Sequence, residues 1–142
     1  MLIRYCSQGR SVLASLDNGT EIIGQITDLT KDMGIEAAFI SAIGALSQAD
    51  LGYYDQAARK YLVTPVDESV ELAACSGNIS LLEGRPFVHA HAVLADGKGR
   101  TWGGHLVRGT VFAAELYLQE LSGLPLKRVP DSITGLNLWG NE

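Results

Sequence analysis

The sequence predicts a single domain of the α/β (α+β) class, in which one amphipathic helix accompanies a longer series of strands. The chain has 142 residues, 46% of them hydrophobic, which is enough for one domain with a genuine core but short for two. Residues 22–33 repeat apolar side chains at helical spacing. Most of the remaining chain alternates apolar runs with turn-forming residues, which is typical of strands. We therefore expect residues 1–142 to form one domain.

The first elements are a strand and the helix. A strand around Ser11–Leu16 is followed by Asp17, Asn18 and Gly19, which are residue types that form turns and cap helices. The helix begins after them, and Gly34 marks its end because glycine commonly terminates helices. The apolar positions that recur every three or four residues are Ile22, Ile23, Ile26, Leu29 and Met33.

The segments after the helix predict strands joined by short turns. The apolar run Ile35–Leu46 is expected to be a buried strand, with Gly44 at a bulge or at a close approach of two backbones. The tail Gly123–Pro130 is expected to be irregular, and a segment around residues 136–139 to pack back on the domain. Further candidate strands are Gln48–Tyr54, Lys60–Thr64, Ser69–Leu81, Phe87–Leu94, Thr101–Leu106 and Val111–Leu121.

Glu115 is a carboxylate in an apolar context. Both faces of Val111–Leu121 look largely buried, and an unpaired buried carboxylate is costly. Glu115 is therefore expected either to meet water at a sheet edge or to pair with a histidine, a metal or an arginine. In the second case it would contact a ligand or support a metal site.

All three histidines of the chain fall within seventeen residues, as His89, His91 and His105. His89 and His91 are two residues apart on one predicted strand, so their side chains point to the same face. The segment that follows is rich in turn formers and predicts a hairpin. If Asp96 pairs with Arg100 in that turn, His105 lies opposite His91. A register shifted by one residue would turn His105 to the other face.

Three imidazoles that converge on one point are typical of a transition-metal site, with zinc as the first candidate. One coordination position then remains for water, a carboxylate or a ligand. The alternative is that each histidine is an ordinary core or interface residue whose ring nitrogens are hydrogen-bonded. The sequence supplies three good ligands and no certain fourth, which favours an open site over a closed structural one.

Charge and composition limit the classes of partner. Charged residues make up 19% of the chain, below the roughly 25% of soluble domains, so an oligomer that covers apolar surface is expected. The net charge is −5 and the basic residues are scattered, which disfavours direct binding to DNA phosphates. Lys98, Arg100 and Arg85, in or beside the hairpin, are the candidates for a local basic patch.

The cysteines and the hydropathy pattern bear on the thiol state and location of the protein. Cys6 and Cys75 lack the spacing of a redox or zinc motif and are expected to be buried free thiols. The chain has no run of about 18 apolar residues and no signal-peptide order at its start. A cytoplasmic location and no membrane association are therefore expected.

Several motifs together resemble the plants-and-prokaryotes-conserved domain, abbreviated PPC or PCC and also described as PD1-like DNA-binding. The strongest are His89-Ala90-His91 and Gly103-Gly104-His105-Leu106, joined by Asp96-Gly97. Others include Ala-x-Ile-Ser-Ala-Ile-Gly-Ala-Leu before them and a closing Ala-Glu-Leu-Tyr-Leu. The similarity covers roughly residues 9–135, which we expect to be the core of the domain.

The resemblance to single-domain prokaryotic members implies a largely antiparallel sheet with flanking helices, assembled as a homotrimer. It also implies that His89, His91 and His105 bind a metal, as in some of those members. Plant relatives join this domain to separate AT-hook motifs that contact DNA. The nearest segment here, Gly84-Arg85-Pro86, lacks the second basic residue of such a hook.

Three functional hypotheses follow. The first is a trimeric assembly or regulatory module, associated with DNA through a partner, in which the histidines hold a structural ion or shape a pocket. The second is a zinc-dependent enzyme or sensor for a small molecule, in which Glu115 orients the ligand or acts as a base. The third is direct DNA binding, which needs a basic stripe across the trimer. Neither a nucleophile elbow nor a phosphate-binding loop occurs, so the sequence leaves open whether the protein is an enzyme.

Overall fold

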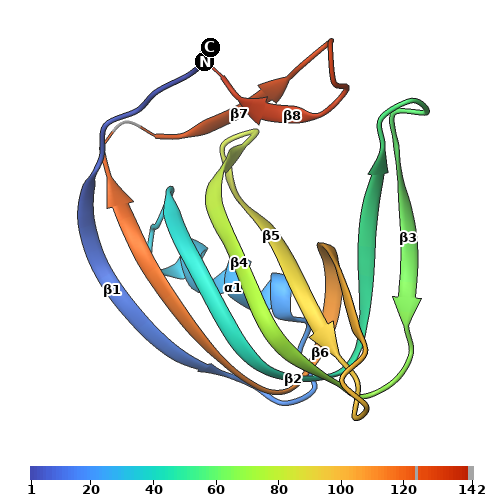
Figure 1. Cartoon of the computed structure of the whole chain (residues 1–142). Coiled ribbons are helices and arrows are strands. Elements are labelled where there is room, and N and C mark those ends of the chain that lie inside the picture. The colour runs from blue at the N-terminus through green and yellow to red at the C-terminus, as the bar shows by residue number, and fades with distance from the viewer. Residues whose placement is uncertain (124, 141–142) are drawn as a thin grey trace.

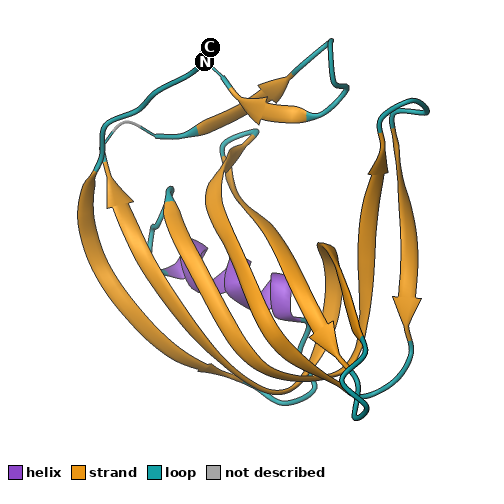
Figure 2. Cartoon of the chain, viewed as in Figure 1, coloured by secondary structure: helices purple, strands orange, loops and turns teal. Residues whose placement is uncertain are grey.

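The computed structural model describes residues 1–123 and 125–140, which form one mostly antiparallel sheet with a single helix (Figures 1 and 2). The helix, α1, spans Ile22–Asp32. The chain therefore has one helix in this part rather than the several flanking helices that the resemblance implies. The strands are β1 (Ser7–Leu16), β2 (Ala38–Asp55), β3 (Lys60–Val66), β4 (Val70–Leu82), β5 (Arg85–Ala95), β6 (Thr101–Ser122), β7 (Lys127–Pro130) and β8 (Asn137–Trp139).

The strands lie in the order β3-β2-β6-β5-β4-β7-β8, and β1 pairs with β6. An additional pairing of β2 with β4 closes a ring of four strands, β2, β6, β5 and β4. Every pairing is antiparallel except the short one between β4 and β7. Each long strand therefore has one face turned to the core and one turned away from it.

The helix covers the core face of the sheet. Ile22 and Ile26 have no exposed surface, and α1 packs against β5 and β6. Its start is capped by Glu21, whose carboxylate accepts hydrogen bonds from the backbone N–H groups of Ile23 and Gly24. The cap therefore lies at Glu21 itself and not at the preceding turn. No helix in residues 1–123 and 125–140 is both long and apolar enough to cross a membrane.

Two strands are longer than the sequence predicts. The segments predicted as Ile35–Leu46 and Gln48–Tyr54 form one strand, β2, and those predicted as Thr101–Leu106 and Val111–Leu121 form one strand, β6. The register of β2 against β6 shifts at three places between Ala45 and Leu51. Such bulges bend both strands without ending their pairing, but they interrupt the alternation of side chains and so resemble strand ends in the sequence.

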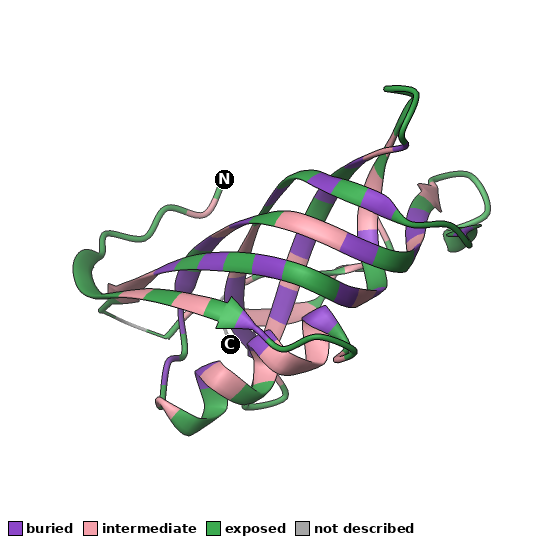
Figure 3. Ribbon diagram, turned by 90° about the horizontal axis from the view of Figure 1, so that it is seen from below, coloured by how far each residue is buried: buried purple, intermediate pink, exposed green. Residues whose placement is uncertain are grey.

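Buried and exposed residues alternate along the strands (Figure 3), and the alternation along β6 corrects a second expectation. Ala114, Leu116 and Leu118 are buried, whereas Glu115 and Tyr117 are exposed. Only one face of this segment is therefore in the core of the chain. The expected close approach at Gly44 is confirmed, because its φ is +147° and a Cβ there would collide with the carbonyl of Ala113.

The C-terminal segment forms a short hairpin of β7 and β8 rather than the irregular tail expected from the sequence; Leu124 of that tail lies outside the described residues. One side-chain and one backbone hydrogen bond connect this C-terminal segment to the rest of the fold. The Tyr54 hydroxyl donates to the carbonyl of Thr134 at 2.7 Å, and the backbone N–H of Leu81 donates to the carbonyl of Leu126 at 2.8 Å. The hairpin thus spans from the end of β4 toward the β2–β3 hairpin (Figure 1).

Both cysteines are free thiols, but only one is buried. Burial raises the pKa of the Cys75 thiol to about 11. Cys6 is exposed, contrary to the expectation, because it precedes β1 and lies outside the core.

Candidate metal centre

The β5–β6 hairpin brings the histidines together as the turn chemistry predicts. The Asp96 N–H donates to the carbonyl of Arg100 at 3.0 Å. Counting back along the ladder from this turn, His91 pairs with His105. The expected register is therefore confirmed, and His105 shares a face with the histidines of β5.

The alternation of β5 decides which way these side chains point. Val88, Ala90 and Ala92 are buried in the core, so the residues between them face the opposite side of the sheet. His89 and His91 occupy this face. The histidines consequently lie on the side of the sheet away from α1.

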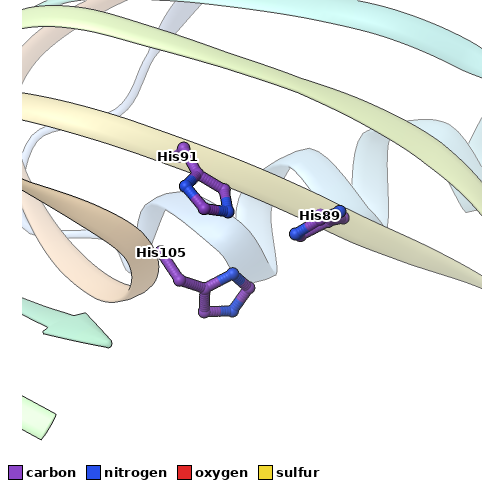
Figure 4. A group of neighbouring side chains, drawn as sticks. All are labelled: His89, His91 and His105. Atoms are coloured by element: carbon purple, nitrogen blue, oxygen red, sulfur yellow. The ribbon is translucent and has the colours of Figure 1, made fainter. Parts of the chain in front are cut away.

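The three imidazoles form a compact cluster. One ligand atom of each histidine lies within 4.8 Å of those of the others. The ring centroids are 5.2 Å apart for His89 and His91, 5.3 Å for His89 and His105, and 5.6 Å for His91 and His105. A ring nitrogen of each points into the space among the three rings (Figure 4). Nitrogens bound to one tetrahedral zinc ion at about 2.0–2.1 Å lie about 3.4 Å apart, so small side-chain movements would bring the three rings onto a single ion.

One nitrogen of this cluster has no partner. Nδ1 of His105 is buried and accepts or donates no hydrogen bond in the described part of the chain. Buried polar atoms are almost always satisfied, and an ion ligated by this nitrogen would satisfy it. The residues present therefore fit a metal, and they fit poorly to the alternative of ordinary hydrogen-bonded histidines.

The surroundings keep two of the rings uncharged. Burial lowers the pKa of His89 to about 4, helped by the positive charge of Arg128 and by the neighbouring histidines. Burial also lowers the pKa of His105, with contributions from His91 and Arg128. Both rings are neutral at pH 7, and neutral imidazole is the form that binds metal.

The structure does not bring Glu115 to the histidines. It lies in the other half of β6, opposite Ser15 of β1 and Ile43 of β2. Its side chain is exposed on the face of the sheet, where the carboxylate is accessible to solvent and distant from the histidines in the strand. Among the described residues, the group that could hold a metal ion consists of the three histidines alone.

Two residues beside the cluster were not foreseen from the sequence. The ring of Tyr61, on β3, lies 5.2 Å from that of His105. Arg128, on β7, donates to Asn78 at 3.0 Å, and Asn78 pairs with His89 across β4 and β5. Neither Tyr61 nor Arg128 carries a sequence signal, because each is brought here by a separate hairpin.

A cavity of about 460 Å³ adjoins the histidines on this face of the sheet. Its size is within the range of small-molecule sites. The wall is mostly apolar, with few polar groups. It includes His89, His91, Asn78, Phe39, Leu126 and Trp139.

The candidate basic residues do not form a patch. Lys98 and Arg100 lie in the turn after β5, whereas Arg85 begins that strand at its other end. Arg100 is also paired with Asp96 at 2.6 Å. Eleven residues of extended strand span about 35 Å, so these three side chains cannot act together in one chain.

Comparison with known proteins gives similar folds over nearly the whole chain. A metal-containing protein from Archaeoglobus fulgidus is 39% identical, with 99% of this chain and 100% of that chain covered and a TM-score of 0.95. A plant- and prokaryote-conserved (PPC) protein from Pyrococcus horikoshii is 42% identical, with 100% and 99% covered and a TM-score of 0.95. A protein from Ralstonia eutropha JMP134 that is proposed to bind DNA is 29% identical, with 92% and 90% covered and a TM-score of 0.82.

Longer proteins also contain a similar segment. The bifunctional protein GlmU of Synechococcus sp. strain JA-3-3Ab is 36% identical over 120 residues, which cover 82% of this chain. The matched part spans only 18% of that protein. Residues 3–122 match the model of a family described as Plants and Prokaryotes Conserved. With this match and the fold shared with the Pyrococcus protein, the chain belongs to the Plants and Prokaryotes Conserved (PCC) domain family.

Proposed function

We propose that this protein binds a divalent transition metal, with zinc as the first candidate, through His89, His91 and His105. The observation that carries the proposal is the convergence of three ligand atoms within 4.8 Å of one another. The unpartnered Nδ1 of His105 supports it. The Archaeoglobus relative, which is a metal-containing protein, supports it independently.

The proposed site keeps one coordination position open. Zinc sites that serve structure alone have four protein ligands, whereas catalytic sites have three and a water or substrate. Here the three histidines adjoin a cavity, so a small molecule has room to approach. A metal held there would supply Lewis acidity toward an oxygen atom of the ligand. The function that fits best is a metal-dependent sensor of, or enzyme for, a small molecule.

We also propose that the chain assembles as a homotrimer. The sheet face opposite α1 exposes large apolar side chains that a monomer would leave in water. Leu13 is 83% exposed and Ile43 is 55% exposed. They line one hollow with Tyr117, and a second copy of the chain would cover this surface.

A regulatory role on DNA is the second candidate function. The Ralstonia relative proposed to bind DNA favours it. The net charge of −5 and the separation of the basic side chains disfavour direct contact with phosphates. For this function, a partner protein would link the trimer to DNA.

Metal content tests the main proposal. Protein purified without an affinity tag is expected to contain about one zinc or similar ion per chain by mass spectrometry of the elements. His91→Ala and His105→Ala should each abolish the metal while circular dichroism stays unchanged. A double variant that retains full occupancy would refute the assignment.

The cysteines provide the matched control. Cysteine is the other common zinc ligand, and a variant with both Cys6→Ser and Cys75→Ser removes every thiol of the chain. Because neither lies in the cluster, this variant should keep the full metal content.

A further inference from the structure

Arg128 differs from every other arginine of the chain in its surroundings. It is half-buried, whereas the other arginines are all exposed. Three of those exposed arginines each hold a carboxylate within 2.7 Å, in the pairs Arg10–Glu120, Arg100–Asp96 and Arg108–Asp50. Arg128 has no ion pair with any carboxylate of residues 1–123 and 125–140. A cation that is partly removed from water without a counter-charge is costly.

Neutral groups hold this guanidinium in one place. Its Nε donates to the Ser80 hydroxyl at 2.8 Å and its Nη2 to Oδ1 of Asn78 at 3.0 Å. Nη1 donates to the carbonyl of Asn137 at 3.0 Å. The guanidinium carbon also lies 5.0 Å from the ring centre of Phe87 and 5.9 Å from that of Trp139. These contacts use three of the five N–H donors of the guanidinium and leave one on each terminal nitrogen.

The guanidinium of Arg128 lies close to the candidate metal centre, since its charge acts on His89 and His105. Asn78 lies directly opposite His89 in the β4–β5 ladder, and such pairs have their Cβ atoms about 5 Å apart. Asn78, His89 and Trp139 also line the same cavity. Arg128 does not line the cavity itself, but it contacts Asn78 and Trp139, which do. A small molecule that binds at the histidines would therefore meet the guanidinium at the edge of the cavity.

We propose that Arg128 binds the anionic group of the ligand that occupies the open position of the metal, and that this ligand is a small oxyanion, a carboxylate or a phosphate compound, with an apolar body. Guanidinium groups recognise carboxylate and phosphate through paired N–H donors. The apolar wall of the cavity, which includes Phe39 and Leu126, accommodates the rest of the molecule. This inference rests on the proposed function, because it names the chemical class of the ligand for the same site.

Calorimetric titration with two simple anions tests the inference. Zinc-loaded protein is titrated with butyrate and, separately, with inorganic phosphate, after its zinc content has been measured. Binding of butyrate alone identifies a carboxylate site, and binding of phosphate alone identifies a phosphate site. Acetate serves as the shorter carboxylate and should bind more weakly than butyrate, since it fills less of the cavity. Failure of both butyrate and phosphate to bind would overturn the inference.

Variants at Arg128 identify the residue responsible. Arg128→Gln should keep its zinc and lose at least about tenfold in affinity for the anion, as expected for a charge-assisted hydrogen bond. Arg128→Lys keeps the charge without the planar pair of donors, so its affinity for the anion should lie between those of wild type and Arg128→Gln. If Arg128→Gln does not fold, the affinity of Arg128→Lys still tests the role of the guanidinium. Equal affinities for wild type and both variants would overturn the inference.

Arg85→Gln is the matched control. Arg85 is exposed and lies four residues before His89 on β5, about 13 Å away along the strand. Its loss removes the same charge without removing a contact, so the anion affinity should stay within about twofold of wild type. An equal loss in Arg85→Gln would mean a general field effect and would overturn the assignment to Arg128. Absence of zinc from the wild-type protein would instead refute the proposed function.

Discussion

His91 and His105 lie directly opposite each other across the β5–β6 hairpin, and this pairing is what turns three separate histidines into one cluster. Directly opposed residues of an antiparallel pair share a face, so His105 joins the face already shared by His89 and His91. The turn that fixes the register is organised by one side chain. The Asp96 carboxylate accepts hydrogen bonds from the backbone N–H groups of Lys98 and Arg100 at 2.9 and 2.8 Å.

We expect Asp96→Ala to weaken metal binding without touching a ligand. The carboxylate also accepts a hydrogen bond from Nε of Arg100 at 2.6 Å, so its removal frees the turn and loosens the position of His105. Zinc affinity, measured by competition with a chromogenic chelator, should fall about three- to tenfold. Lys98→Ala, an exposed position in the same turn, is the control and should bind zinc like wild type. Equal affinities for Asp96→Ala and Lys98→Ala would show that the turn does not set the site.

The lowered pKa of His89 predicts how the metal-free protein responds to acid. The pKa is about 4 in the folded chain and 6.5 ordinarily, so between these values the unfolded state binds a proton that the folded state does not. The free energy of unfolding should therefore fall as the pH drops from 6.5 to about 4, and this contribution should level off below pH 4. Urea denaturation at a series of pH values, with a chelator present, measures this dependence.

His89→Gln provides the comparison for the acid response. Glutamine keeps a polar side chain that does not titrate, so the fall in stability between pH 6.5 and 4 should be shallower in this variant. A wild-type protein that becomes more stable over the same interval would contradict the burial of a neutral ring at His89.

The histidine cluster could be derived from the sequence because each step depends on local chemistry. The spacing of His89 and His91 sets their common face, and the turn residues at Asp96 and Arg100 set the register of His105. Arg128 could not be derived in this way. Its place depends on how β7 docks against β4, and strands of three or four residues carry no periodic signal.

The long strands show a similar limit. Alternation predicted the segments of β2 and β6 but not their continuity, because bulges reverse the alternation within a continuous strand. Glu115 was expected in a mostly buried strand for a related reason. A sheet face that is exposed in one chain can be as apolar as a core, as Leu13, Ile43 and Tyr117 are, and the sequence does not distinguish the two.

The backbone contact at Gly44 should make that position intolerant of a side chain. A Cβ there would collide with the carbonyl of Ala113, and the φ of +147° is unfavourable for other residues. Gly44→Ala is expected to lower the free energy of unfolding by at least about 2 kcal/mol. Gly97→Ala, where a Cβ meets nothing within 4 Å, should change it by less than about 0.5 kcal/mol. Urea denaturation of the two variants measures the difference, and similar values would contradict the close approach.

The proposed trimer should depend on the apolar surface around Leu13. Leu13 lies opposite Tyr117 in the β1–β6 ladder. Leu13→Glu would place a carboxylate on this surface, and the carboxylate would have to lose its water when copies of the chain associate. Light scattering should give the mass of three chains for wild type and of one chain, 15.2 kDa, for the variant, with an unchanged circular dichroism spectrum. Ile133→Glu is the control, because Ile133 is 80% exposed but lies in the β7–β8 loop. A trimer that survives Leu13→Glu would place the interface elsewhere, and a wild-type monomer would refute the assembly.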